Sequence, residues 1–435
     1  MKRTILTTLV VAALVQGAWA QSGTNSPYSQ FGLGLLTDQT SGFNRGMNGL
    51  GYGFHEHNQV NFQNPASYAS LDSLTFIFDV GLSGQVTNFK EGSKKLNANN
   101  ADFEYAVAGL RLMRHVGLGF GIVPFTTVGY SHSSTVDVND ANKTTMTNTY
   151  KGSGGLHQVF LGLGWEPFRG FSVGVNGSYL YGDYSRSVVS SFSDTYANTL
   201  TKLYSAEVQN YRLDFGLQYT QQLTKKDAVT LGLTYSYGHK IGGEPKLNLI
   251  STNAQTSVSD TLTLPRNGKL QLELPHSFGG GLMWNHNNSV KVGVDYSLMR
   301  WSVVHGPEYV ASNAAGEADY HMASNLYKDR HKFTLGAQIC PDERGQSLLK
   351  RIQYRAGVSY ATPYYYINGS DGPKELSASI GFGIPIRNSY NNRSILNISG
   401  QWVRQDAKNF ITENTFRINI GLTFNERWFA KWKVD

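Results

Sequence analysis

Large apolar residues alternate with polar or very small ones in many stretches of this chain. In the stretch 211–220, Tyr211, Leu213 and Phe215 alternate with Arg212 and Asp214. Successive side chains of a β-strand point to opposite faces, so such a stretch has one apolar and one polar face. The pattern recurs between positions 74 and 425 and predicts an all-β protein.

The recurring pattern predicts about 14 strands. They are expected to begin near Leu74, Phe103, Val116, His157, Phe171, Tyr204, Ala228, Leu270, Ser289, Lys332, Arg351, Leu376, Ser394 and Thr415. A water-soluble sandwich would hide the apolar faces in a core, whereas a closed barrel can turn them toward lipid. Because an even number of strands is usual for bacterial outer-membrane barrels, we expect a transmembrane antiparallel β-barrel over residues 74–425.

The first 20 residues have the features of a secretory signal peptide. Met1-Lys2-Arg3 precedes an apolar stretch over 5–15, and Ala18-Trp19-Ala20 offers a cleavage site. No cysteine follows the apolar stretch, which speaks against a lipoprotein. We expect a mature chain that begins near Gln21 and lies in the outer membrane of a Gram-negative bacterium.

The connections between the expected strands alternate in length. Short ones lie around 113–115, 166–170, 222–227, 285–288 and 388–393, and long polar ones span 88–101, 136–154, 190–202, 241–268, 302–330 and 362–374. Outer-membrane barrels have short periplasmic turns and longer outer loops, so both chain ends are expected on the periplasmic side. The connection 341–350 takes a short place in this series but is longer than the others.

Composition and charge narrow the choice of function. The chain has 47 Gly, 25 Tyr, 22 Phe and 7 Trp with only 16% charged residues, which suits a barrel. After the signal, no apolar run reaches the roughly 18 residues of a membrane helix. The net charge of +7 falls to +5 without Lys2 and Arg3, and the basic residues are scattered, so we expect no nucleic-acid partner. The only cysteine, Cys340, excludes an internal disulfide and is expected to be a buried thiol.

Residues 21–73 lack strand periodicity but are rich in glycine, asparagine and aromatic residues. Their aromatic side chains are Tyr28, Phe31, Phe43, Tyr52, Phe54, Phe62 and Tyr68. Folding into the barrel lumen would bury them, so we expect an N-terminal plug, or hatch, at 21–73. A periplasmic tail is expected at 426–435.

The end of this segment resembles a known family. Asn64-Pro65-Ala66 is similar to the hatch motif of the FadL family of outer-membrane transporters for long-chain fatty acids and other hydrophobic compounds, and the stretch 274–278 is similar to a Leu-Pro-x-Ser-Phe segment of these proteins. The resemblance implies a divergent FadL-like transporter, in which a kink in the third strand opens the barrel wall sideways. Pro124 lies in the third expected strand and cannot donate a ladder hydrogen bond, so it is the candidate for a lateral opening. A bulge near the rim is the other interpretation.

Charged residues of both signs fall on inward positions of the strands. They are Glu104, Arg212, Asp214, Lys291, Asp295, Lys332, Arg355 and Arg417. In a lumen shielded from water they are expected to pair with each other or with the plug. The sharper hypothesis is that Arg212, Asp214, Lys291, Asp295, Arg355 and Arg417 contact the head group of an amphipathic ligand.

Other chemistry has less support in the sequence. His55-Glu56-His57 offers metal ligands, but no clear third and fourth ligand lies nearby, so we expect a polar surface and no metal. No spaced motif selects a catalytic serine, histidine and acid, so we expect neither an enzyme nor a cofactor. The aromatic and basic tail fits a membrane interface or the docking of a periplasmic partner.

Two functions stay open. In the first, the barrel passes hydrophobic or amphipathic compounds through a plugged lumen with a lateral opening near the third strand, and its partners are outer-membrane lipid and an amphipathic small molecule. In the second, it is a non-transporting subunit or scaffold of an outer-membrane protein secretion or assembly complex, beside other outer-membrane proteins. The inward charges favour a filled lumen, and Pro124 with the hatch favours a gated path.

Overall fold

The computed structural model describes residues 23–138, 143–312, 317–343, 345–386 and 394–427. The expected signal peptide, residues 428–435 of the expected tail and the expected short connection at 388–393 lie outside these ranges.

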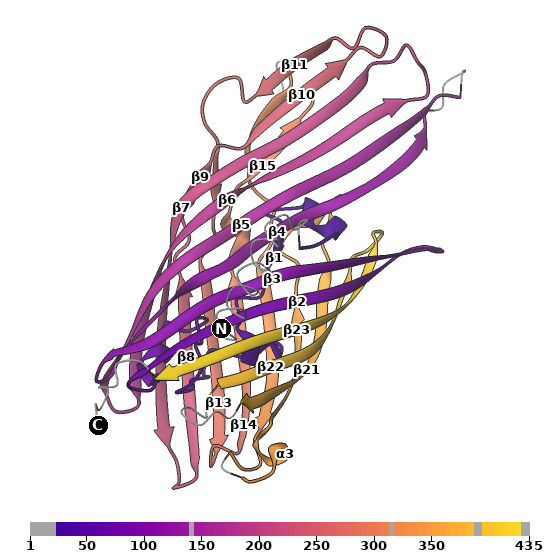
Figure 1. Cartoon of the computed structure of the whole chain (residues 1–435). Coiled ribbons are helices and arrows are strands. Elements are labelled where there is room, and N and C mark those ends of the chain that lie inside the picture. Colours follow the sequence, from indigo (N-terminus) through magenta and orange to yellow (C-terminus); the bar gives the residue numbers. More distant parts are fainter. Residues whose placement is uncertain (1–22, 139–142, 313–316, 344, 387–393, 428–435) are drawn as a thin grey trace, which may run out of the picture.

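Fourteen strands in the described part of the chain form one closed antiparallel barrel (Figure 1). They are β2 (Thr75–Glu91), β3 (Lys94–Met113), β4 (Val116–Asp137), β5 (Thr145–Phe168), β6 (Phe171–Phe192), β7 (Thr199–Gln222), β8 (Asp227–Ser236), β13 (Ser277–His286), β14 (Val290–Met299), β17 (Arg330–Ile339), β18 (Gln353–Ala361), β21 (Lys374–Ile386), β22 (Ser394–Asp406) and β23 (Thr412–Arg427). Neighbours in the chain are neighbours in the barrel, and pairing of β2 with β23 closes the wall. The expected fold class is confirmed, with a strand at each of the expected places.

Shorter elements precede the barrel or lie in its connections. They are η2 (Pro27–Gln30), β1 (Leu35–Leu36), α2 (Gly42–Arg45), η3 (Pro65–Ser70), β9 (Lys240–Gly243), β10 (Lys246–Thr252), β11 (Ser259–Leu264), β12 (Gln271–Glu273), η4 (Trp301–Val303), β15 (Gly306–Val310), β16 (Asp319–Ala323), α3 (Leu348–Arg351), β19 (Tyr366–Ile367) and β20 (Ser370–Asp371). None of the described helices is long and apolar enough to span a membrane.

The outer face of the barrel is apolar and the inner face is polar, as the alternation predicts. On β23 the outward Phe416 and Ile418 are 56% and 60% exposed, while the inward Asn419 is 3% exposed. On β14 the outward Val294 is exposed, and the inward Asp295 beside it is buried. The exposed apolar band suits contact with lipid tails, because closed pairing leaves few backbone groups without a partner there.

The long polar connections differ from expectation, because strands occupy most of them. β2 runs to Glu91 and β3 begins at Lys94, so little of 88–101 is a loop. β5 and β7 each have 24 residues, whereas β8, β13, β14 and β17 each have 10. Beyond the apolar band polar residues are frequent on the outer face, so the alternation weakens while the backbone pairing continues. We call the end with these extensions the long-loop end and the opposite end the short-turn end.

The described residues before β2, here called the N-terminal segment (23–73), pack against inward faces of the barrel strands. Tyr28 and Leu33 join Leu272, Trp301 and Tyr364 in an apolar cluster toward the long-loop end. Phe43, Met47, Leu50 and Phe54 form a second cluster with Met283 of β13. The segment thus supplies much of the apolar core that a barrel by itself does not have.

Candidate functional site

The expected hatch motif lies at the start of η3, inside the barrel. Asn64 caps η3, because its Oδ1 accepts a hydrogen bond from the Ala66 amide at 3.2 Å. Its Nδ2 donates to the backbone oxygens of Tyr52 at 2.8 Å and of Leu217 on β7 at 3.2 Å. One side chain therefore fixes the turn into η3, ties two parts of the N-terminal segment together and attaches both to the wall.

A row of inward glycines receives this motif. Gly117, Gly164, Gly174 and Gly216 lie side by side on β4, β5, β6 and β7, where each is the register partner of the next. A Cβ on these glycines would lie 1.9 Å from the Tyr68 oxygen, 2.6 Å from the Pro65 oxygen, 2.4 Å from the Pro65 carbonyl carbon and 2.1 Å from Asn64 Oδ1, respectively. No side chain fits there, so the wall is shaped for close contact with the backbone of η3.

A second row of inward glycines contacts the middle of the N-terminal segment. Gly293, Gly336 and Gly357 are successive register partners on β14, β17 and β18. A Cβ on Gly357 would lie 2.4 Å from the Met47 carbonyl carbon, and one on Gly336 would lie 3.0 Å from Met47 Cβ. Glycines of the wall therefore match the path of the segment at two separate places.

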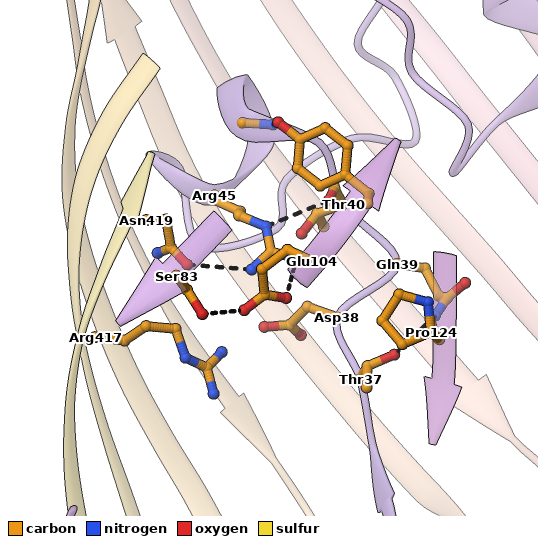
Figure 2. A network of polar contacts seen from close by, with 12 residues as sticks. Thr37, Asp38, Gln39, Thr40, Arg45, Ser83, Glu104, Pro124, Arg417 and Asn419 are labelled. Carbon is orange, nitrogen blue, oxygen red and sulfur yellow. Dashed lines mark hydrogen bonds and ion pairs between the residues drawn. The ribbon is translucent and has the colours of Figure 1, made fainter. Parts of the chain in front are cut away.

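A buried ion pair fastens α2 to the wall (Figure 2). Arg45 Nη2 lies 2.8 Å from Glu104 Oε2 of β3, and the two side chains are 4% and 9% exposed. Arg45 also donates to Asn419 Oδ1 at 3.2 Å and to the Thr40 carbonyl at 3.3 Å, and Ser83 Oγ donates to Glu104. Each charge thus has its partner and further hydrogen bonds, as a buried pair requires.

Three more contacts join inward charges of the wall to the N-terminal segment. Lys332 Nζ lies 2.9 Å from Asp38 Oδ1, and Lys291 pairs with Glu56. Asp295 Oδ2 accepts the amides of Gly51 at 2.7 Å and Tyr52 at 3.0 Å. Burial opposes ionisation of Asp38, but the charge of Lys332 and its hydrogen bond outweigh it and lower the pKa of that carboxyl.

The remaining candidate head-group residues bind mainly other wall residues. Arg212 pairs with Asp214 at 2.8 Å and donates to Gln158 at 3.1 Å. Arg355 donates to Gln338 at 2.7 Å and to Asn397 at 2.6 Å. Arg417 donates to Gln85 at 2.9 Å. The six candidates therefore do not converge on one site.

Pro124 lies where the barrel wall changes its pairing. β3 and β4 pair only from Met113↔Val116 to Ala106↔Ile122, and the register between β4 and β5 shifts between Pro124 and Thr126. Beyond this point β4 leaves β3 and continues with β5 toward the long-loop end (Figure 1). Pairing between β3 and β4 thus ends two residues before Pro124, and the register shift with β5 begins at Pro124.

The N-terminal segment covers the β4 side of this interruption. Leu35 and Leu36 of β1 pair with Thr127 and Thr126. Thr37 Oγ1 and Gln39 Nε2 donate to the Pro124 carbonyl at 2.7 Å and 2.8 Å (Figure 2). The backbone groups left by the bulge are therefore bonded to the chain's own N-terminal segment.

Two of the cavities in the described part of the barrel have a volume of about 100 Å³ each. One is lined by Asp38, Asp102, Glu104, Glu413 and Arg417, among other residues near β1. The other is lined by Arg212 and Asp214 together with Phe62, Phe160 and Met299. Ser178 Oγ also lines the second cavity, in which it has no hydrogen-bond partner, and this residue is 6% exposed.

His55, Glu56 and His57 line a larger hollow near the turn after β13, of about 360 Å³. Cys340, 5% exposed, lines the same hollow, and its Sγ lies 3.7 Å from the Arg351 carbonyl. Glu56 is engaged by Lys291, and His57 Nδ1 lies 3.3 Å from Asp72 Oδ2. Nowhere in the described ranges do three or more His, Cys, Asp or Glu side chains gather as metal ligands.

Sequence reasoning missed the contacts of Asp38, Arg45 and β1. The inward positions of Glu104 and Lys332 were visible in the alternation, but their partners lie in a segment without periodicity. The glycine rows were visible only as inward glycines, because their alignment depends on the register between strands.

Comparison with known proteins agrees with this architecture. The family model named BamG matches residues 1–435. A search of curated proteins found no match.

Solved structures share the barrel fold at low identity. The CymD monoaromatic hydrocarbon channel is 17% identical with a TM-score of 0.56, covering 92% of this chain and 99% of that chain. The toluene transporter TbuX of Ralstonia pickettii and a FadL homologue of Pseudomonas aeruginosa are each 14% identical with a TM-score of 0.59, covering 90% of this chain and 99% of theirs. The expected resemblance to FadL proteins is confirmed as a shared fold. The chain belongs to the BamG family, and its barrel has the fold of the FadL-type hydrocarbon channels.

Proposed function

We propose that this protein is an outer-membrane barrel that works as a subunit of an assembly of outer-membrane proteins, with its lumen kept closed by its own N-terminal segment. The glycine row Gly117, Gly164, Gly174 and Gly216 carries the proposal. Because the barrel wall has no side chains where the backbone of η3 lies against it, the wall is shaped for an N-terminal segment that stays in place. The match to the BamG family is consistent with a place beside other outer-membrane proteins.

The free-energy cost of breaking the ion pairs between the N-terminal segment and the wall supports a closed lumen. Removing one partner of a buried ion pair costs about 3–5 kcal/mol. Arg45–Glu104 is such a pair, and the contacts of Lys332 with Asp38 and of Lys291 with Glu56 add to it. Withdrawing the segment for each passage event would break all three contacts and uncover the clusters around Phe43 and Tyr28.

The size of the internal cavities points the same way. Ligand pockets usually measure about 300–1,000 Å³. The hollow at His55, of about 360 Å³, lies near the turn after β13, and the two lumenal cavities, of about 100 Å³ each, are smaller than that range. One of them is lined largely by polar and charged groups, which suits water better than a hydrocarbon.

The proposed orientation places the short-turn end in the periplasm and the long-loop end outside the cell. The apolar belt then faces lipid, and β4 to β7 extend beyond the membrane. These extensions offer strand surface outside the lipid for contacts with other proteins.

Extraction of the native protein in mild detergent tests the proposal. The expected result is a particle of fixed stoichiometry that contains this chain and other outer-membrane proteins, with the N-terminal segment in place. A lone barrel of 48.0 kDa or less after signal cleavage, obtained repeatedly under conditions that preserve other complexes, would contradict it.

A second candidate function is lateral passage of an amphipathic compound, and the second cavity favours it. Arg212 lies there beside Phe62 and Met299, and Ser178 Oγ has no hydrogen-bond partner. A guanidinium beside apolar side chains suits a molecule with an anionic head and an apolar tail. The interruption of pairing between β3 and β4 would supply the exit.

Binding of dodecanoate to the purified barrel tests this candidate. Replacement of Arg212 by Gln is expected to weaken binding at least tenfold, because the anionic head loses a charged partner. Replacement of the exposed Arg266 by Gln is the matched control and should change nothing. Equal binding by both variants and the unmodified protein would exclude the cavity as a head-group site.

A further inference from the structure

The barrel wall leaves two strand edges facing each other. β3 pairs with β2 up to Lys94↔Glu91, and β4 pairs with β5 up to Asp137↔Thr145. The two strands pair with each other only as far as Ala106↔Ile122. Over the half nearer the long-loop end, each strand therefore has one side turned toward the interruption.

The β4 side already receives an extended segment. β1 is antiparallel to it at Thr126 and Thr127, and the Thr37 amide donates to the Phe125 carbonyl at 3.1 Å. Ser29 Oγ bonds to both the amide and the carbonyl of Gly129, at 3.0 Å and 3.2 Å. The free edge of β4 at the interruption thus pairs with an additional strand, and that strand is β1 of the same chain.

The β3 side offers a longer edge. Glu91 and Lys94 flank a two-residue turn, a geometry in which these two residues share hydrogen bonds across the hairpin. The amides of Lys95, Asn97, Asn99 and Ala101 then point away from β2. These four residues are exposed, and in the described part of the chain no strand pairs with them on that side.

Such an edge is unusual for a protein that stays alone. Natural edge strands are blunted by charged side chains, especially lysine, by proline, by bulges or by a covering element. Lys94 and Lys95 blunt only the end of this edge beside the β2–β3 turn, and the following stretch 96–101, Leu-Asn-Ala-Asn-Asn-Ala, contains neither proline nor a charged residue. The bulge between β2 and β3 lies at Gly81 and Leu82, nearer the short-turn end than this stretch.

We propose that the β3 edge over residues 95–101 accepts an extended segment of another outer-membrane or surface protein as an added strand. This inference rests on the proposed function and names one of its interfaces. Main-chain hydrogen bonds would give the affinity, and side chains beside the edge would set the choice of segment.

Charge and polarity define the chemistry of that segment. Lys90, Lys94 and Lys95 are exposed around the β2–β3 turn, where Glu91 is the only acid among them. Asn97 and Asn99 continue the edge with neutral polar groups. The segment is therefore polar and has an acidic side chain where it passes the β2–β3 turn.

Hydrogen exchange of the edge amides tests the inference in three samples. They are the isolated barrel in detergent, the isolated barrel in vesicles containing lipopolysaccharide, and the natively extracted assembly. The amides of Asn97, Asn99 and Ala101 are expected to exchange rapidly in the first two samples. In the third sample their exchange rates should be lower by a factor of roughly ten or more. Asn99→Pro removes one edge amide that points away from β2, so it should lower the yield of the assembly, while Asn99→Ala should not.

Other outcomes overturn the inference. Slow exchange in the vesicles would mean that lipid covers the edge, and fast exchange in all three samples would mean that nothing does. An Asn99→Pro barrel that folds and assembles like the Asn99→Ala control would also overturn it. Assembly with a fast-exchanging edge would reject only this interface, whereas a lone barrel on extraction would reject the proposed function.

Discussion

Replacing Arg45 by Met should loosen the N-terminal segment inside the barrel. The change leaves Glu104 buried in β3 without its cation, while the methionine fills part of the same space. Glu104→Gln makes the converse change and leaves Arg45 without its anion. The contacts with Asn419 and Ser83 cannot replace the lost charge, because both groups are neutral. The other charges nearby, Arg417 for Glu104 and Asp38 for Arg45, act more weakly than the missing partner and offset only part of the loss.

The size of the effect follows from burial. The two side chains are 4% and 9% exposed and 2.8 Å apart, so solvent screens them little. Breaking such a pair costs about 3–5 kcal/mol, and about 1.4 kcal/mol corresponds to a factor of ten. Local opening of α2 should therefore increase by roughly 100- to 4,000-fold in either single variant.

Hydrogen exchange of the α2 amides in the folded barrel measures this opening directly. The double variant Arg45→Met, Glu104→Gln should exchange more slowly than either single variant, because it leaves no buried charge unpaired. Lys328→Met is the control, since Lys328 pairs with Asp371 near the surface, and it should leave α2 unchanged. Single variants that exchange within about fivefold of the unmodified protein would refute the role given to this pair.

Two further predictions concern the hatch. Gly216→Ala should destabilise the barrel by about 1–3 kcal/mol, because the added Cβ would lie 2.1 Å from Asn64 Oδ1. Urea unfolding in vesicles measures this change. Gly177→Ala is the control and should be neutral, since its added Cβ would have only a backbone oxygen 4.0 Å away. The hydrogen bond that the His57 imidazole donates to Asp72 raises the pKa of His57 above 6.5, and Glu56 and Glu343 act in the same direction. This contact therefore stabilises the protein below about pH 6.5, and the stabilisation is lost as pH rises through the raised pKa. His57→Gln should remove that part of the pH dependence of unfolding, and an unchanged profile between pH 6 and 8 would contradict the assignment.

The strands could be predicted because lipid imposes a simple rule on one face of each. Val294 and Ile418 had to be apolar, and their neighbours Asp295 and Asn419 were then placed inside. The rule ends where the lipid ends. In the extensions of β4 to β7 the outer face carries many polar residues, while apolar residues such as Val128, Tyr184 and Val208 are buried. The row of outward apolar residues that marks a membrane strand is therefore weak there.

The candidate site could be predicted only in part, because the barrel wall has a periodic sequence pattern and the N-terminal segment has none. Inward charges such as Lys332 and Glu104 were visible from the alternation. Their partners Asp38 and Arg45 lie in a segment whose path is set by contact with the wall rather than by its own periodicity. Pro124 could be singled out because proline lacks the ladder donor, and it lies at the register shift between β4 and β5, whereas the pairing of β1 with β4 has no signal beyond two leucines.

The central claim is that the lumen stays filled while the protein works, and a reversible tether tests it most directly. Leu36 and Thr126 are cross-strand partners, and the neighbouring bond from Thr37 to Phe125 makes them a non-hydrogen-bonded pair with Cα atoms about 4.5 Å apart, within disulfide range. Leu36→Cys and Thr126→Cys in a Cys340→Ala background would lock the N-terminal segment to β4 on oxidation. We predict equal yields of the native assembly, and equal growth of cells that depend on this protein, with the tether closed or reduced. A loss of function on oxidation that a reductant restores would show that the segment must move, and would contradict the claim.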